Sequence, residues 1–189
     1  GPMDYTQGAM RNATRSNYRP ANNEPMSQGT RCRQLAEYTV FFAPLTMLCD
    51  RPSTSLEEPE CTAFIASVPT VWDETVALPG NRTGECVAVA RRSGDTWYVA
   101  GINGLDDPQT LATGLGFIGT GKVKAQLFAD VPGAGTVLRT LNGIDTGYRY
   151  MLSGNWMVFL ESDNGRALVV RVLYAKSDYM RTLFGEIDG

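Results

Sequence analysis

The sequence predicts an α/β segment followed by an all-β segment, because the pattern of its apolar residues changes at residue 68. Upstream of that point, short apolar runs alternate with stretches of helical periodicity, as in an α/β barrel or a doubly wound sheet. Downstream, short strand-like runs are separated by glycine-rich turns, and we expect no helix of any length there. We therefore expect two domains, 1–67 and 68–189, of which the second is an antiparallel β-sandwich.

The first helix of the α/β segment is expected to begin at Ser27 or Thr30 and to run to about Phe42. Either hydroxyl side chain can cap a helix N-terminus, and Pro44 would end the helix. Before it, the stretch 3–10 is interpreted as the end of a strand, followed by a long polar loop.

A second strand and helix are expected after Pro44. The apolar run 45–49 (LTMLC) has the length of a buried parallel strand. A helix is then expected from Ser53 to about Ser67, with glutamates in its first turn that would suit the positive end of the helix dipole. The glutamates are Glu57, Glu58 and Glu60.

The all-β segment alternates strand-like runs with turn sequences such as SGD, GTG and DNG. Two of these turns, Gly94-Asp95 and Asn164-Gly165, are expected to form tight hairpins. The expected strands are Val71–Leu78, Glu85–Arg92, Trp97–Ile102, Thr110–Leu115, Lys122–Asp130, Trp156–Glu161 and Leu168–Tyr174.

The composition is that of an ordinary globular protein. Of the 189 residues, 43% are hydrophobic and 20% are charged. No apolar run approaches the roughly 20 residues that span a bilayer, so we expect no membrane span. The net charge of −3 and the absence of a basic face argue against a nucleic-acid partner.

The chain contains no histidine, which excludes Ser-His-Asp and Cys-His catalytic systems and any zinc site with a histidine ligand. The four cysteines never form C-x-x-C, so we expect buried, reduced thiols and no metal site. A Cys49–Cys61 disulfide stays open as an alternative in an oxidising compartment.

Two glycine patterns resemble nucleotide-binding motifs. Gly114, Gly116 and Gly119 match G-x-G-x-x-G, and Gly121-Lys122 resembles the end of a phosphate-binding loop. Both motifs need a helix after them, whereas the sequence KVKAQLFAD alternates like a strand. We therefore interpret these residues as turn glycines.

The candidate site residues of the first segment are Asp4, Tyr5 and Asp50. Asp50 follows an expected strand, and the active site of a (β/α)₈ barrel lies at the carboxyl ends of its strands. The alternative for Asp50 is a cap on the next helix. In the second segment, Trp72, Trp97, Tyr98 and Trp156 are interpreted as core residues, with a sugar-stacking platform as the alternative.

Four stretches together resemble glycoside hydrolase family 97, a family of α-glucosidases and α-galactosidases. They are GPMDYTQGAMRNATR, PMSQGTRCRQLAEYTVFFAPLTMLCD, PECTAFIASVPTVWDET and GECVAVARRSGDTWYVAGIN, and the likeness covers roughly residues 1–130. The resemblance implies the last two β/α units of a catalytic barrel in residues 1–67, and the C-terminal β-sandwich of the family in residues 68–189.

The resemblance also implies a function for the whole protein: hydrolysis of α-glucosidic or α-galactosidic bonds in oligosaccharides, with bound calcium and a periplasmic location. The catalytic carboxylates and the calcium ligands of the family lie on barrel segments that precede residue 1. This chain is then expected to be inactive alone, with Asp4, Tyr5 and Asp50 at the pocket rim and with a sandwich that supports the barrel and can form homo-oligomers. A non-catalytic carbohydrate-binding module is the competing interpretation.

Overall fold

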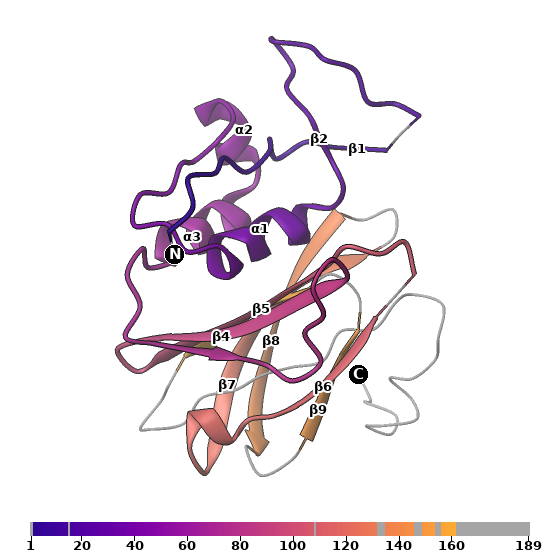
Figure 1. The fold of residues 1–189 in the computed structure, drawn as a ribbon. Helices are drawn as coiled ribbons and strands as arrows, with labels where there is room; N and C mark the ends of the chain where they lie inside the picture. The colour runs from indigo at the N-terminus through magenta and orange to yellow at the C-terminus, as the bar shows by residue number, and fades with distance from the viewer. Residues whose placement is uncertain are drawn as a thin grey trace, which may run out of the picture.

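A computed structural model of the chain describes residues 2–14, 16–107, 109–131, 135–145, 149–153 and 156–161. Three short helices lie over one face of a large antiparallel sheet, and a two-stranded sheet lies on the other side (Figure 1). The large sheet has the strand order β3-β4-β5-β10-β7-β8, and the small sheet pairs β6 with β9. The all-β architecture expected after residue 68 is therefore confirmed for the described residues.

The strands of the large sheet are β3 (Glu74–Ala77), β4 (Cys86–Ser93), β5 (Thr96–Asn103), β7 (Lys122–Val131), β8 (Gly135–Asp145) and β10 (Trp156–Glu161). The small sheet contains β6 (Thr110–Gly114) and β9 (Arg149–Ser153). Six of the seven expected strands have a counterpart, although β3 is shorter than predicted. The seventh, Leu168–Tyr174, and the expected Asn164-Gly165 turn lie outside the described residues, whereas β8 and β9 are strands that the sequence analysis did not predict.

The β4–β5 hairpin forms as the sequence predicts. Ser93 pairs with Thr96, which leaves Gly94 and Asp95 as a two-residue loop. Gly94 has a φ of +57°, a conformation that glycine adopts without steric cost. The turn thereby fixes the register that puts Trp97 opposite Arg92 and Tyr98 opposite Arg91.

The prediction of turn glycines holds in part: Gly119 and Gly121 lie in the connection before β7, whereas Gly114 belongs to strand β6 and Gly116 to a short 3-10 helix. Gly114 ends β6, a short 3-10 helix η1 covers Gly116–Ile118, and β7 begins at Lys122. Gly119 has a φ of +98°. The element that follows is a strand, so no helix N-terminus is available to hold a phosphate at this point.

Helix α1 (Arg31–Val40) begins as predicted, with Thr30 as its N-cap. The Thr30 hydroxyl oxygen accepts a hydrogen bond from the Arg33 backbone N–H at 3.2 Å. Ser27, the other predicted cap, instead lies in β2 (Ser27–Gln28), which pairs in parallel with β1 (Asn12–Ala13).

The second predicted helix is broken into α2 (Pro52–Glu57) and α3 (Pro59–Ser67). The break falls at Glu58, whose φ of −123° and ψ of 62° are not helical. Pro59 causes it, because proline has no N–H and disfavours a helical conformation in the residue before it. The prediction of one acidic first turn was therefore wrong: Glu57 ends α2, and only Glu60 lies in the first turn of α3.

The strand predicted at 45–49 does not form, and the segment is irregular. Leu45, Met47 and Leu48 are 73%, 49% and 53% exposed. A parallel strand needs a hydrogen-bonding neighbour, and the described residues place none beside this segment. The stretch 3–10 is likewise irregular, so the α/β segment contributes helices but neither of its expected strands.

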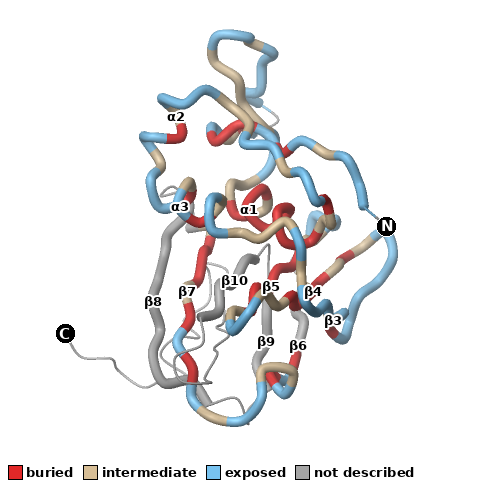
Figure 2. Tube along the Cα trace, turned by 90° about the vertical axis from the view of Figure 1, so that its left-hand side faces the viewer, coloured by how far each residue is buried: buried red, intermediate tan, exposed pale blue. Residues whose placement is uncertain are grey.

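The strands β4, β5 and β7 of the large sheet bury side chains on both faces, and their neighbouring residues alternate between two clusters of apolar side chains. The outer cluster faces the small sheet and includes Trp97, Val99, Leu115, Val123 and Leu127. The inner cluster lies under the helices, and it joins Leu35 of α1 and Phe64 of α3 to Tyr98 of β5 and Phe128 of β7. Figure 2 shows buried stretches on α1 and on the sheet strands that it covers.

The helices of 1–67 therefore share one hydrophobic core with the sheet of the second segment. Two contacts reinforce this junction at the start of α1. The Cys32 thiol donates to the Phe128 carbonyl oxygen at 3.2 Å, and the Cys32 backbone N–H donates to Asp130 Oδ1 at 3.2 Å. The domain boundary at residue 67 stays a prediction.

Candidate functional site

The three predicted site residues belong to the irregular segments that flank α1. Asp4 is exposed, Tyr5 is half-buried and Asp50 is half-buried. Among the described residues, no hydrogen bond or ion pair joins their three side chains. Asp50 and Tyr5 instead hold the two ends of the segment 5–10, and the role of all three at a pocket rim stays a prediction.

Tyr5 anchors the beginning of this segment to α1. Its hydroxyl donates to the Glu37 carbonyl oxygen at 3.3 Å, and its ring packs edge-on against Phe41 with 5.0 Å between centroids. Burial raises the pKa of Tyr5 to about 12. The hydroxyl therefore keeps its proton, and this hydrogen bond, across the physiological pH range.

Asp50 anchors the other end through the backbone of Met10. Asp50 Oδ2 accepts from the Met10 N–H at 3.1 Å, while Oδ1 accepts from the Arg51 N–H at 2.7 Å. On the other side, the Arg31 guanidinium donates to the Met10 carbonyl oxygen at 3.0 and 3.1 Å. Asp50 is not the cap of the following helix, because the N-cap of α2 is Arg51.

Asp50 has a φ of +85°, which is unusual for a residue with a side chain. We expect Asp50→Ala to lower the free energy of unfolding by about 2 kcal/mol, because it leaves the buried Met10 N–H unpaired and keeps the left-handed backbone. Asp50→Asn keeps an acceptor oxygen and tolerates this φ, so it should cost about 1 kcal/mol or less. Urea denaturation checks both values, and an Asp50→Ala variant as stable as wild type would contradict the anchoring role.

Glu37 is a buried carboxylate on α1, 7% exposed, and Arg33 Nη1 lies 2.6 Å from its Oε1. Burial raises the pKa of Glu37, although the Arg33 charge opposes the shift. An acid whose folded-state pKa is raised contributes stability below its unfolded pKa of 4.5, and that contribution is lost as the pH rises through the folded-state pKa.

Glu37→Gln cannot ionise and should therefore not lose this stability as the pH rises. We expect the thermal midpoint of the variant minus that of wild type to increase between pH 4 and pH 7. Arg33→Gln is the matched control, because without the arginine charge the pKa of Glu37 should rise further and the loss should extend to higher pH. Thermal melts at several pH values measure both effects. Parallel pH profiles for wild type and Glu37→Gln would show that this carboxylate does not govern the pH dependence.

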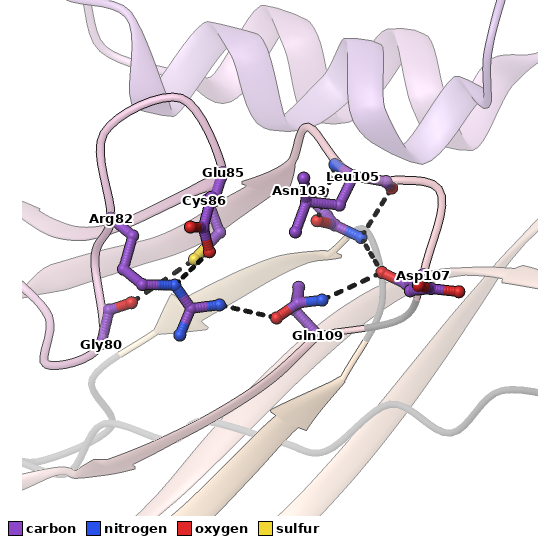
Figure 3. A network of polar contacts seen from close by, with 8 residues as sticks. All are labelled: Gly80, Arg82, Glu85, Cys86, Asn103, Leu105, Asp107 and Gln109. Carbon is purple, nitrogen blue, oxygen red and sulfur yellow. Dashed lines mark hydrogen bonds and ion pairs between the residues drawn. The ribbon is translucent and has the colours of Figure 1, made fainter.

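A second polar region joins the loop before β4 to the loop after β5 (Figure 3). Arg82 forms an ion pair with Glu85, and its Nη2 donates to Gln109 Oε1 at 2.7 Å. Gln109 Nε2 donates to the Asp107 carbonyl oxygen at 3.2 Å, and Asn103 Nδ2 donates to the same oxygen at 2.9 Å. The two loops are thus connected through a chain of side-chain contacts.

This region borders an open groove of about 340 Å³ lined by residues 81–87, Ile102 and Gly104. Its lining carries one carboxylate, that of Glu85, which is paired with Arg82. Glycoside hydrolysis needs two carboxyl groups that flank the bond to be broken. The groove therefore lacks the groups for this chemistry.

The predicted aromatic residues do not form one stacking surface. Trp97 is 4% exposed in the outer cluster, where its ring packs against Phe117 at 4.9 Å. Trp72 is half-buried beside the inner cluster and packs edge-on against Tyr98 at 5.2 Å. The two tryptophans thus belong to clusters on opposite faces of the sheet, as core residues do, and the side chain of Trp156 lies outside the described residues.

The cysteines match the expectation of reduced thiols. All four are free, with Cys32, Cys61 and Cys86 buried and Cys49 half-buried, so the Cys49–Cys61 disulfide is not formed. Burial raises the pKa of Cys61 to about 11. Within the described residues, no three side chains of the metal-binding types gather, and no helix has the length and apolar character needed to cross a membrane.

Comparison with known proteins decides the family. Residues 71–149 match the model of the glycosyl-hydrolase 97 C-terminal, oligomerisation domain. A retaining α-galactosidase of Bacteroides thetaiotaomicron is 56% identical over 130 residues, which are 69% of this chain and 19% of that protein. The chain belongs to glycoside hydrolase family 97.

Other relatives agree with this assignment. A probable retaining α-galactosidase of Streptomyces bingchenggensis is 29% identical over 101 residues, which are 53% of this chain and 14% of that protein. A family 97 enzyme from Pseudoalteromonas sp. strain K8, solved in complex with acarbose, superposes with a TM-score of 0.69 at 26% identity and covers 89% of this chain and 27% of its own. A β-arabinopyranosidase superposes with a TM-score of 0.68, also at 26% identity, and covers 84% of this chain and 25% of its own.

The family 97 chain thus spans less than a fifth of the curated relatives and about a quarter of the solved structures. Sequence reasoning missed three buried or half-buried polar residues at the contacts of the first segment: Arg31, which donates to the Met10 carbonyl oxygen, Arg91, which donates to the Val40 carbonyl oxygen, and Gln34, which is 3% exposed. For Arg91 a signal was available, because it follows Val87 and Val89 at a spacing of two residues and so lies on the face of β4 that the helices cover. For the other two the sequence gives no signal, since polar residues on a short helix are usually exposed.

Proposed function

We propose that the whole protein is a retaining α-galactosidase and that this chain is the non-catalytic part that closes and supports its barrel. The match to the Bacteroides thetaiotaomicron enzyme carries the proposal, at 56% identity over 130 residues. Residues 68–189 number only 122. The likeness therefore includes residues of the first segment and is not confined to the oligomerisation domain.

The exposed apolar run 45–49 supports the barrel part of the proposal. Leu45, Met47 and Leu48 expose apolar surface that a soluble protein usually covers. A neighbouring barrel strand would supply both that cover and the backbone hydrogen bonds of a buried parallel strand. Asp50 would then lie at the carboxyl end of this strand, where barrel active sites are found.

The described residues fit a supporting role better than a catalytic one. The groove beside Arg82 carries one carboxylate, and several acidic side chains are paired with arginines. No three metal-ligating side chains gather among the described residues. We propose calcium and a periplasmic location for the whole protein on the family resemblance alone. Homo-oligomer formation is proposed from the description of the matching domain.

The test uses the full-length protein encoded by the complete reading frame. We expect it to cleave p-nitrophenyl α-galactoside faster than the α-glucoside, and proton NMR should show the α-anomer of galactose as the first product. The 189-residue chain alone should cleave neither substrate. Preference for the glucoside, or β-galactose as the first product, would contradict the proposed activity, and hydrolysis by the isolated chain would contradict the supporting role.

The full-length protein also tests the pocket-rim prediction for Asp50. A residue that contacts substrate should lose kcat/KM on Asp50→Asn substitution although the protein remains folded. Unchanged kinetics in a variant of unchanged stability would limit Asp50 to its anchoring role.

A further inference from the structure

Two glutamine amides are buried where the N-terminal segment meets α1. Gln7 and Gln34 are each 3% exposed. Gln34 Nε2 and both polar atoms of the Gln7 amide have no hydrogen-bond partner of good geometry among the described residues. The Gln7 amide nevertheless lies near enough to the Tyr5 hydroxyl to lower its pKa, as a weak hydrogen bond would. Each unpaired buried polar group costs about 1–3 kcal/mol. Buried amides of this kind normally have a partner.

The same two amides line a small cavity of about 10 Å³, together with Tyr38 and Cys49. This volume corresponds to about one water molecule. It is too small for a sugar ring or for a side chain from another part of the protein. Apolar side chains make up most of the lining, but the polar groups of Gln7, Gln34 and Tyr38 can supply the hydrogen-bond partners that a buried water needs.

Close packing around Gly8 and Tyr38 limits how far the backbone can move to close the cavity. A Cβ atom at Gly8 would lie 1.7 Å from Ser27 Oγ and 2.7 Å from Gln34 Nε2, so the segment already touches its neighbours there. Tyr38 is held as well, because its hydroxyl donates to the Met47 carbonyl oxygen at 2.7 Å. The Tyr38 oxygen keeps a lone pair that can accept one further hydrogen bond.

We propose that this cavity binds one structural water molecule, which joins the segment 5–10 to α1 through Gln7 and Gln34. The water accepts a hydrogen bond from the Gln34 amide and donates to the Gln7 carbonyl oxygen, and its second proton can be donated to the Tyr38 oxygen. Three hydrogen bonds are typical of a buried water. Turning the Gln7 amide by 180° still presents a hydrogen-bonding atom to the cavity, because neither of its polar atoms has a partner of good geometry among the described residues.

The sign of a stability change tests the proposal. If water is bound, Gln7→Met and Gln34→Met each remove one of its partners and should lower the thermal midpoint of the chain by about 2–4 °C. If the cavity is dry, each methionine removes an unpaired amide and should raise the midpoint instead. Gln28→Met is the matched control, because Gln28 is exposed and its substitution should change little.

Two further measurements keep the test decisive should a variant fold poorly. Oxygen-17 relaxation dispersion of the wild-type chain should detect a long-lived water that is absent in Gln7→Met/Gln34→Met, and a high-resolution crystal structure should show a density peak within hydrogen-bond distance of both amides. A raised midpoint in the single variants, or a wild-type crystal structure without that peak, would overturn the proposal.

Discussion

Replacing Phe128 with alanine should lower the free energy of unfolding of the chain by about 3–5 kcal/mol. Phe128 is 1% exposed at the centre of the inner cluster, and its ring packs edge-on against Phe64 of α3 at 4.9 Å between centroids. Its backbone carbonyl accepts from the Cys32 thiol of α1. The substitution therefore leaves a cavity between the helices and the sheet, where neither side can easily collapse.

The neighbouring residue provides the matched control. Leu127 is 3% exposed on the same strand, but it packs in the outer cluster on the opposite face of the sheet. Leu127→Ala should cost about 2–5 kcal/mol. Because the helices and the sheet share a core, urea unfolding followed by tryptophan fluorescence and by circular dichroism should give one common transition for both variants.

Separate transitions would contradict this expectation. If residues 1–67 unfold independently of the sandwich, Phe128→Ala should detach the helices at low urea and leave the sheet signal nearly unchanged. Leu127→Ala should then shift only the later transition. The pair of variants thus distinguishes a shared core from two adjoining domains. The change of sequence pattern at residue 68 cannot make this distinction.

Local sequence signals predicted the elements that depend on neighbouring residues. Gly94-Asp95 has the chemistry of a two-residue turn and forms one, and Thr30 caps α1 with its own hydroxyl. The alternation of β4, β5 and β7 likewise follows from side chains that point to opposite faces. In each case the residues that decide the structure lie within a few positions of one another.

The failures have two physical causes. The segment 45–49 carries the apolar pattern of a strand, but a strand also needs a partner, which the described residues do not supply. Strand β8 was not predicted, and it contains Asn142-Gly143, a pair with the composition of a turn. The register shifts there, since Val123 pairs with Ile144 whereas Lys124 pairs with Asn142, so that Gly143 is the extra residue of a β-bulge.

The candidate site was harder to predict, because its residues act through contacts distant in sequence. Asp50 was selected for its place after an apolar run, yet its observed contact is the Met10 backbone, 40 positions away. Gln7 and Gln34 are 27 positions apart and meet only in the folded chain. Nothing in the local pattern indicates that either amide is buried.

Arg91 provides the second large expected effect, because it is a buried cation at the junction of the two segments. It is 7% exposed, and its Nη2 donates to the Val40 carbonyl oxygen at 3.1 Å, at the negative end of α1. The guanidinium carbon lies 5.5 Å from the ring centroid of Phe42 and 5.7 Å from that of Trp72. Burial lowers the pKa of the Arg91 guanidinium.

Arg91→Ala should therefore cost about 3 kcal/mol, from a charged hydrogen bond and the contacts with two aromatic rings. Arg91→Met is the informative comparison, since it keeps the aliphatic stem but removes the charge. The Arg91 Nε has no hydrogen-bond partner among the described residues. An incompletely paired buried charge gains little over an apolar residue of similar size, so Arg91→Met should cost less than half as much as Arg91→Ala. Urea denaturation measures both variants. If the two substitutions lower the free energy of unfolding equally, the charge itself stabilises the packing of the helices on the sandwich, through its contacts with the end of α1 and the two rings.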